Sequence, residues 1–365
     1  MFEKNRLLGK KLLATGNGRC NIHNVNATFK NYHSSTFDKN SLVKILNALP
    51  FSDFEKMMRE FGLLLEALDD GRVYPLSNSA KSILEIFLSF LENKDFFLEN
   101  EVLEIIPQKD SYFLKTSQGD FSFKCVVLAC GSEASFKLGG SDKGIRLAKN
   151  LGLECIDTYP SLVSLCGEFA LKNISGIKIN AKLVLKEKRE EVFGDVLFTD
   201  YGISGFGVLD ISQKVRKDSI LYIDFLPNLD SNFLESLLVK VIKQYPQKSL
   251  KEVLAGILHP KLARAFEESL KIYTLNTKGI KRVIFALKNM EFQVSETKGF
   301  DFAEVSGGGV SAKEIDANTM ECVRYKNLYL LGEMLDVVGD RGGYNLAFAW
   351  ASAFVCFRHL KSLSL

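Results

Sequence analysis

The stretch LGEMLDVVGDRGGYN, from Leu331 to Asn345, follows an apolar run at 328–331 and leads into a strongly apolar segment. This pattern predicts a buried strand, a glycine-rich loop and then a helix that begins at Asn345. A helix that begins there presents free backbone N–H groups and a partial positive charge at its first turn. The stretch therefore predicts a place where negative charge is stabilised.

Two interpretations of this loop are open. A reduced flavin carries negative charge at its N1–C2 edge, which a helix N-terminus stabilises, and Glu333 or Asp336 can accept hydrogen bonds from ribityl hydroxyl groups. Alternatively, the two acids cap the helix, and Gly342 and Gly343 only form a tight connection.

Glycine-rich loops follow apolar strands at two other places, at 16–21 within LLATGNGRCN and at 131–144. In an open parallel sheet, ligands bind beyond the carboxyl ends of the strands, where such loops gather. Glycine allows close approach of the backbone, and unpaired N–H groups favour anions. One such loop is weak support, but three together predict a nucleotide or flavin site.

Composition limits the classes of function. The 365 residues carry a net charge of only +3 with mixed signs, so we expect no nucleic-acid partner. The seven cysteines are scattered and form no CxxC pair, which predicts reduced thiols, a cytoplasmic location and no metal site. The longest apolar stretch, within 344–357, is too short to span a bilayer, so we expect no membrane association.

The pattern of predicted secondary structure alternates along the chain. Residues 1–159 and 306–365 show strands followed by glycine loops and predict one discontinuous α/β domain. The intervening 160–305 predicts an insert, with a β-barrel part at 160–228, a helical part at 229–290 and a return strand at 291–305.

Several motifs together resemble one family. In order, they are LLGKKLLATGNGRCNIHN, GRVYPLSNSA, VVLACG, GDVLFTDYGISG, GGVSAKEIDANTME and NLYLLGEMLDVVGDRGGYNLAFAWAS. From Glu3 to about Phe357 the chain is similar to the bacterial aminoacetone-oxidase-type, or BaiN-like, FAD-binding proteins. This resemblance implies a glutathione-reductase-like FAD domain with an inserted β-barrel and a small helical bundle. It also implies a flavin-dependent oxidoreductase that binds FAD non-covalently. Hydride would pass through flavin N5 between NAD(P)H or a small organic substrate and an acceptor such as oxygen or an activated double bond.

The resemblance also implies roles for residues. Glu3 would bind the adenosine ribose, Val102 would lie in the strand that passes the adenine, and Ala129 and Gly131 would lie in and after the next strand. The residues against the flavin and pyrophosphate would be Gly16, Gly18, Arg19, Cys20 and Asn21. Those facing the ribityl chain would be Gly332, Glu333 and Asp336, and those at the flavin ring Gly342, Gly343, Tyr344 and Asn345.

The roles of individual side chains stay open. Cys20 is either a redox thiol or, as we favour without a CxxC partner, a packing residue. Arg19 pairs with a pyrophosphate or with a carboxylate of the protein, and Tyr344 lines the substrate face or packs. Cys20 and Tyr344 are the only catalytic candidates. For His23 we favour a surface or capping position over acid–base catalysis.

The Lys-rich helices at 239–251 and 261–282 are expected to be solvated faces, because Glu252, Glu267 and Glu268 interrupt their positive charge.

The family fold begins with a strand, a GxGxxG turn and a helix, and no such turn lies near the start of this sequence. Met1 stands where the second strand should be ending, so we expect an N-terminally truncated form of the fold. Two readings follow. The natural start lies upstream, or the chain is a non-catalytic remnant or binding protein that no longer holds FAD tightly.

Overall fold

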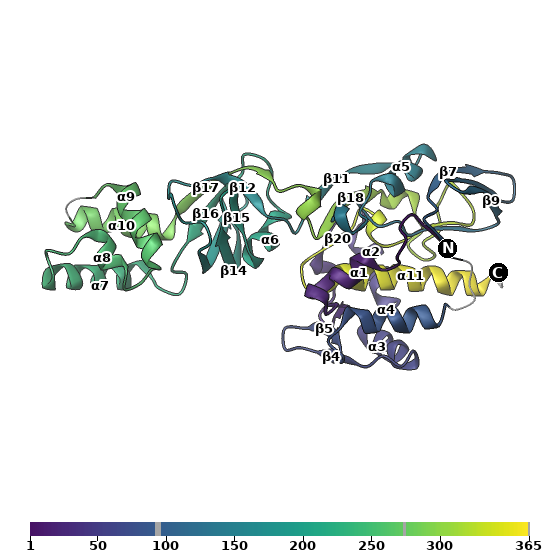
Figure 1. Ribbon diagram of the computed structural model, residues 1–365, viewed down its shortest axis with the longest axis horizontal. Coiled ribbons are helices and arrows are strands. Elements are labelled where there is room, and N and C mark those ends of the chain that lie inside the picture. The colour runs from purple at the N-terminus through teal and green to yellow at the C-terminus, as the bar shows by residue number, and fades with distance from the viewer. Residues whose placement is uncertain (92–95, 273–274, 364–365) are drawn as a thin grey trace. The chain divides into compact units, whose positions relative to one another are not determined.

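The computed structural model describes residues 1–91, 96–272 and 275–363. Contacts divide the chain into two compact units (Figure 1). Unit 1 comprises Met1–Ser161 and Ala303–Leu365, and unit 2 comprises Leu162–Phe302. The predicted α/β class with an inserted closed barrel is confirmed.

Two parallel strand pairs lie in unit 1. The first joins β1 (Phe2–Glu3) to β6 (Phe97–Leu98), and the second joins β10 (Val126–Leu128) to β19 (Leu328–Leu330). Within the described part of the chain, no strand is hydrogen bonded to both pairs.

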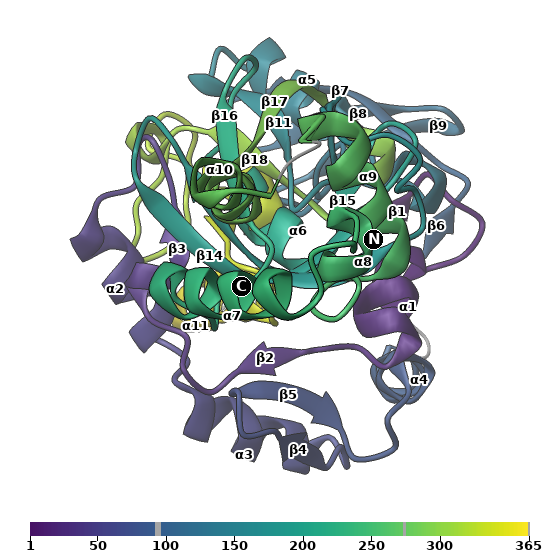
Figure 2. The same cartoon turned by 90° about the vertical axis from the view of Figure 1, so that its left-hand side faces the viewer.

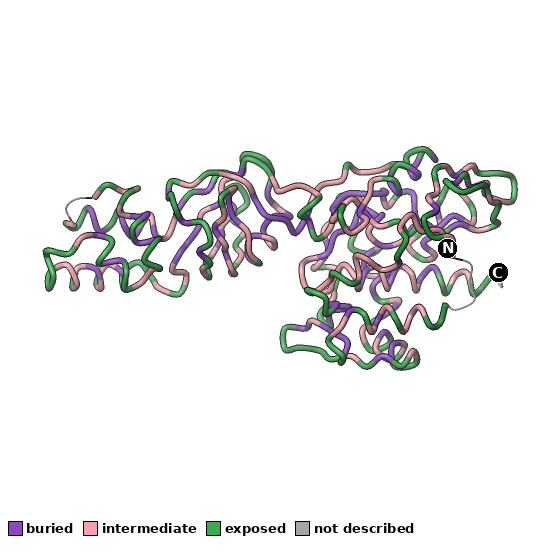
Figure 3. The backbone as a smooth tube through the Cα atoms, viewed as in Figure 1, coloured by how far each residue is buried: buried purple, intermediate pink, exposed green. Residues whose placement is uncertain are grey.

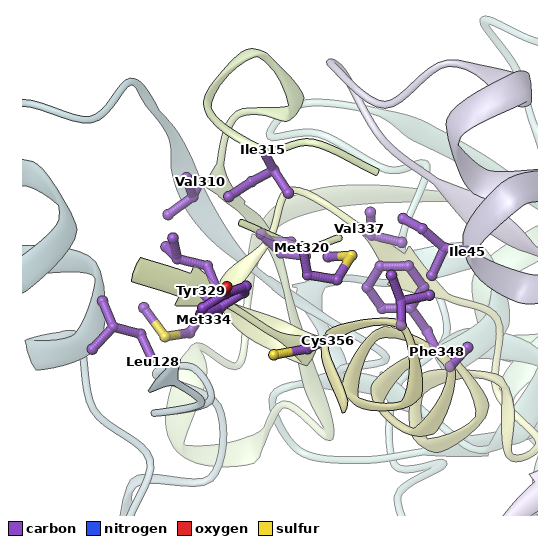
Figure 4. Close-up of a cluster of buried hydrophobic side chains, with 14 of the residues drawn as sticks. Ile45, Leu128, Val310, Ile315, Met320, Tyr329, Met334, Val337, Phe348 and Cys356 are labelled. Carbon is purple, nitrogen blue, oxygen red and sulfur yellow. The ribbon is translucent and has the colours of Figure 1, made fainter. Parts of the chain in front are cut away.

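The core of unit 1 gathers around β19, whose three residues are fully buried. Tyr329 of this strand lies among Leu128, Met334 and Cys356 (Figure 4). Cys356 belongs to the long helix α11 (Tyr344–Ser362), the helix that the apolar segment predicted. Burial of these side chains fixes the loop between β19 and α11 at both of its ends.

The remaining elements of unit 1 surround this core. Its other strands form antiparallel ladders: β7 (Val102–Pro107) with β8 (Tyr112–Thr116) and β9 (Gly119–Phe123), β2 (His23–Asn24) with β5 (Arg72–Pro75) and β4 (Leu65–Ala67), β3 (Tyr32–His33) with β20 (Val338–Gly339), and β11 (Cys155–Ser161) with β18 (Val305–Val310). Its other helices are α1 (Lys10–Ala14), α2 (Lys39–Asn47), α3 (Phe51–Glu60), α4 (Ala80–Ser89) and α5 (Lys143–Asn150).

Unit 2 contains a closed six-stranded barrel. Around it run β12 (Leu165–Glu168), β15 (Gly202–Ser204), β14 (Glu190–Phe198), β13 (Lys178–Leu185), β16 (Ile220–Asp224) and β17 (Met290–Thr297). Burial alternates along much of β13 and β17, because successive side chains point to opposite faces, and Figure 3 colours the backbone by burial. In β17, for example, Met290, Phe292 and Val294 are buried.

The described residues of unit 2 also form five α-helices. They are α6 (Phe206–Ser212), α7 (Ser231–Gln244), α8 (Leu250–Leu254), α9 (Pro260–Leu270) and α10 (Thr277–Lys288). The last four gather at one end of the barrel (Figures 1 and 2) and share its hydrophobic core. No helix in the described residues is long and apolar enough to cross a membrane.

Candidate functional site

The segment Thr15–Gly18 follows α1, is kinked at Gly16 and Asn17, and leads into the GRCN segment, residues 18–21. Asn17 and Cys20 both have positive φ angles, of 56° and 58°, so the chain bends sharply here. The Cys20 side chain is fully buried in the core of unit 1. Burial raises the pKa of its thiol to about 11. A buried, protonated thiol is a packing group, which favours the structural role of Cys20 over the redox one.

Arg19 points away from this core and is exposed. Its Nε donates to the Gly16 carbonyl at 3.3 Å, and its guanidinium lies 4.8 Å from the centre of the Tyr74 ring. Among the described residues it has no acidic partner. This finding speaks against the alternative in which Arg19 pairs with a carboxylate of the protein. The guanidinium is therefore available to an anion such as a pyrophosphate.

The two acids of the loop after β19 are engaged by protein groups. Glu333 Oε2 accepts from Lys11 Nζ at 3.0 Å, and its Oε1 accepts from the Ser306 amide at 3.1 Å. Asp336 is buried, and its Oδ2 accepts three hydrogen bonds. The donors are Ser34 Oγ (3.2 Å), the Ser35 amide (2.9 Å) and Thr36 Oγ1 (2.9 Å).

Neither acid caps α11, which begins after Gly343 without a side-chain cap. Their predicted position along a ribityl chain stays a prediction. The Glu333 side chain is 21% exposed and paired with Lys11, whereas the buried Asp336 carboxylate fastens this loop to residues 34–36.

The start of α11 packs directly against the GRCN segment. A Cβ at Gly343 would lie 2.3 Å from the His23 carbonyl oxygen and 2.8 Å from Asn21 Oδ1, so only glycine fits there. Asn21 Oδ1 itself accepts from the Val73 amide at 3.2 Å. The structure thus brings the glycine loop at 16–21 and the loop between β19 and α11 together through Asn21 and Gly343.

Two other side chains at this helix start differ in their freedom. The Asn345 amide is used inside the loop, since it bonds the Gly339 N–H and carbonyl and the Asp340 carbonyl. Tyr344 is half-buried, and its hydroxyl has no hydrogen-bond partner among the described residues. Burial, helped by the charges of Asp340 and Asp70, raises the pKa of Tyr344, so it is a neutral phenol near pH 7.

The glycine loops at 131–144 and 332–343 approach each other at Gly131 and Glu333. Gly131 and Gly332 have φ angles of 70° and 61°. Apart from its chain neighbours, a Cβ at Gly131 would meet nothing nearer than Glu333 Oε2 at 3.8 Å, and a Cβ at Gly332 nothing nearer than 3.5 Å. The face of Gly131 is therefore open, whereas Gly332 is buried and its face is covered by Ala349. The open backbone at Gly131 fits an FAD, which needs close backbone approach at this loop.

The other residues assigned by resemblance lie at strand ends or at the start of β7. Glu3 ends β1, and its charge acts on the thiol of Cys130, so the ends of β1 and β10 lie close together. Glu3 Oε1 accepts from the Asn5 amide and side chain. Ala129 follows β10 and is exposed, and Val102 opens β7 as part of the core periphery. The backbone at Gly18 is also open, because a Cβ added there would lie 3.9 Å from its nearest neighbour, the Leu13 carbonyl oxygen.

Several polar residues at this surface were not predicted. Lys11 holds Glu333, and His33 Nε2 lies 2.7 Å from Asp340 Oδ1 beside the start of α11. Arg72 pairs with Asp70 at 2.6 Å. Lys11 and Arg72 lie inside the motifs LLGKKLL and GRVYP, and their place in these motifs is the sequence signal that could have identified them.

The expected surface or capping position of His23 is wrong. The ring is buried, stacked at 4.6 Å on Phe54, and its Nδ1 donates to the Asn24 carbonyl at 3.0 Å. Its strand β2 lies beneath the start of α11, which the spacing of the sequence does not reveal.

Known proteins resemble this chain over nearly its whole length. The HI0933-like protein Rossmann domain matches residues 1–359. A 3-dehydro-bile acid delta(4,6)-reductase of Clostridium scindens is 30% identical over 376 residues, which covers 98% of this chain and 91% of that protein. A ribosomal RNA dihydrouridine synthase of Escherichia coli is 28% identical over 374 residues, covering 99% and 91%. The open conformation of a flavocytochrome c3 fumarate reductase superposes with a TM-score of 0.39 and 14% identity, over 87% of this chain and 63% of that one.

Proposed function

The chain belongs to the HI0933-like Rossmann family, and on that premise we propose that it is an FAD-dependent reductase of carbon–carbon double bonds conjugated to a carbonyl group. The observation that carries the proposal is the contact of the 332–343 loop with both other glycine loops, through Gly343 and Asn21 and through Glu333 and Gly131, with open backbone at Gly131. Family membership makes this face the candidate FAD site.

The reaction class is supported by what two relatives are named for. One is named as a reductase of a 3-dehydro bile acid and the other as a dihydrouridine synthase. In both substrates a carbon–carbon double bond is conjugated to a carbonyl group, and both names describe the addition of two hydrogens. A conjugated double bond accepts hydride at one carbon and a proton at the other.

Particular residues would hold the cofactor. The open backbone at Gly131 would lie along its ribityl and phosphate part, Arg19 would pair with the pyrophosphate, and Glu3 would bind the ribose. The start of α11 would face the N1–C2 edge of the ring. When bound, FAD supplies the hydride at its N5 atom, with the two electrons coming from a reduced pyridine nucleotide.

The protein must supply the proton. Tyr344 stands at the start of α11 with a neutral hydroxyl that no described residue engages, so we assign it as the proton donor to the second carbon. Cys20, the other candidate, is fully buried and takes no part.

FAD binding is tested by the visible spectrum of the purified protein and by a pair of glycine variants. Gly131→Ala and Gly62→Ala both place a side chain at positive φ in open space, so each should cost about 1 kcal/mol of stability. Gly62 lies in the turn between α3 and β4 and is the control. We expect only Gly131→Ala to weaken FAD binding, on the order of tenfold. Absence of flavin absorbance, with no recovery on adding FAD, would refute the proposal.

Activity is tested anaerobically with NADH or NADPH and two substrates, a 4-en-3-one steroid and uridine-containing RNA. The expected product is heavier by two hydrogens, as mass spectrometry reads it. Tyr344→Phe should lower kcat on the order of 100-fold while reduction of the flavin by the pyridine nucleotide keeps its rate. If Tyr344→Phe slowed flavin reduction and substrate reduction equally, Tyr344 would not be the proton donor.

A further inference from the structure

Helix α10 of unit 2 has one buried face and one strongly basic face. It buries Ile280, Val283, Ile284 and Leu287 in the core of the unit. Its exposed side carries Lys278, Lys281, Arg282 and Phe285, here called the α10 stripe. Their spacing of three, four and seven residues aligns them on one side of the helix. Together with neighbouring side chains they line a shallow depression.

The aromatic ring of the stripe is unusually free. Phe285 is 67% exposed, although helices normally turn such a side chain inward. It stands one turn from Lys281 and Arg282, at the C-terminal end of the stripe, so a flat apolar surface lies beside two cations.

The positive charge of the stripe is not neutralised. Lys278, Lys281 and Arg282 have no acidic partner among the described residues of the chain. Residues 230–289 hold eleven Lys and Arg against five Asp and Glu, a net charge of +6, whereas the whole chain carries +3. The helical part of unit 2 is therefore basic and the rest of the chain is acidic.

The acids that interrupt this region in sequence lie elsewhere in the structure. Glu252 caps its own helix α8 through the Ser249 amide at 2.8 Å. Glu267 Oε1 accepts from the Lys251 amide at 3.0 Å, and Glu268 lines a different depression from the α10 stripe. The sequence interleaves both signs of charge, but folding separates them, which removes the reason for expecting no nucleic-acid partner.

We propose that the α10 stripe binds RNA, with its three cations on phosphates and Phe285 stacked on an unpaired base. Cations spaced along a helix match a phosphate backbone, and a free ring beside them matches a base exposed in a single strand or loop. An anionic membrane fits less well, because surface helices that bind lipid bury a broad apolar face and this stripe has one apolar residue. The inference goes beyond the proposed function and stands without it.

The test is fluorescence anisotropy of the full chain with a fluorescein-labelled 20-nucleotide single-stranded RNA of mixed sequence. We expect binding that prefers this strand to an RNA duplex of the same length and that weakens with KCl. The triple variant Lys278→Ala, Lys281→Ala, Arg282→Ala should bind on the order of tenfold more weakly and lower the salt slope by about 2, at about 0.7 per phosphate contact. Phe285→Ala should weaken binding about tenfold with an unchanged slope.

The matched control removes three other exposed lysines of the same helical region, Lys240, Lys243 and Lys261. These lysines also have no acidic partner among the described residues, and we expect their alanine variant to bind within about twofold of the wild type. Circular dichroism confirms that each variant is folded.

Three results would overturn the proposal: no RNA binding by the wild type at 50 mM KCl, equal losses in both triple variants, or binding to phosphatidylserine-containing vesicles without binding to RNA. None of these readouts depends on flavin or on reductase activity.

Discussion

Acidification should destabilise unit 1 through His23. This ring is 4% exposed and stacked on Phe54, and burial lowers its pKa from 6.5 to about 4. The folded state therefore prefers the neutral ring, while the unfolded chain binds a proton near pH 6.5. The stabilising contribution is complete above pH 6.5 and is lost as the pH falls toward 4.

The size of the effect follows from the two pKa values. Each unit of difference is worth about 1.4 kcal/mol, so the loss relative to pH 8 is about 2 kcal/mol at pH 5 and about 3 kcal/mol at pH 4. Such a loss is a large part of the stability of an ordinary domain.

The chain offers a direct probe for this measurement. Its single tryptophan, Trp350, lies in α11 with its ring 5.6 Å from that of Phe54, which itself stacks on His23. Urea unfolding followed by tryptophan fluorescence at pH 8, 6 and 5 therefore reports on unit 1. His23→Gln should lose most of the pH dependence, and the control His33→Gln, at a half-exposed position, should keep it. An unchanged pH dependence in His23→Gln would refute the reasoning.

Three further predictions concern buried polar groups. Asp336→Ala leaves three donors without their acceptor and should cost about 3 kcal/mol in urea unfolding; a loss below 1 kcal/mol would contradict the contacts described. Arg324→Ala removes the 2.7 Å partner of the buried Glu314 carboxylate and should cost about 2 kcal/mol, whereas the exposed control Lys313→Ala should change stability by less than about 0.5 kcal/mol. Cys20 should resist iodoacetamide at pH 8 in the native protein and react in urea, and peptide mapping that finds it modified in the native state would disprove its burial.

Local patterns in the sequence predict much of the fold. The glycine loops after β10 and β19 are visible because a short apolar run ends at a glycine, and α11 is visible because its apolar residues are continuous. The change in predicted secondary structure along the chain likewise predicts an insert with strands before helices, because apolar residues recur with different periods in strands and in helices.

The chemistry of the site is less predictable, because it depends on partners distant in sequence. Glu333 is engaged by Lys11 and Asp336 by residues 34–36, each about 300 positions away. No spacing rule links such pairs, so a carboxylate that looks free in sequence is occupied in the fold. The burial of His23 and the separation of Glu267 from the α10 stripe have the same origin.

The pairing of the strands at the two ends of the insert affects the order in which the two units fold. In unit 2 the first strand, β12, pairs with the last, β17, so the two ends of this unit are neighbours once it is folded. In unit 1, β11 and β18 must also pair, although roughly 140 residues separate them in sequence. Closing so long a loop in an unfolded chain costs about 3 kcal/mol more than closing a loop of a few residues. If unit 2 folds first, that entropy is already spent, so synthesis of an intact insert should speed the assembly of the domain that surrounds it.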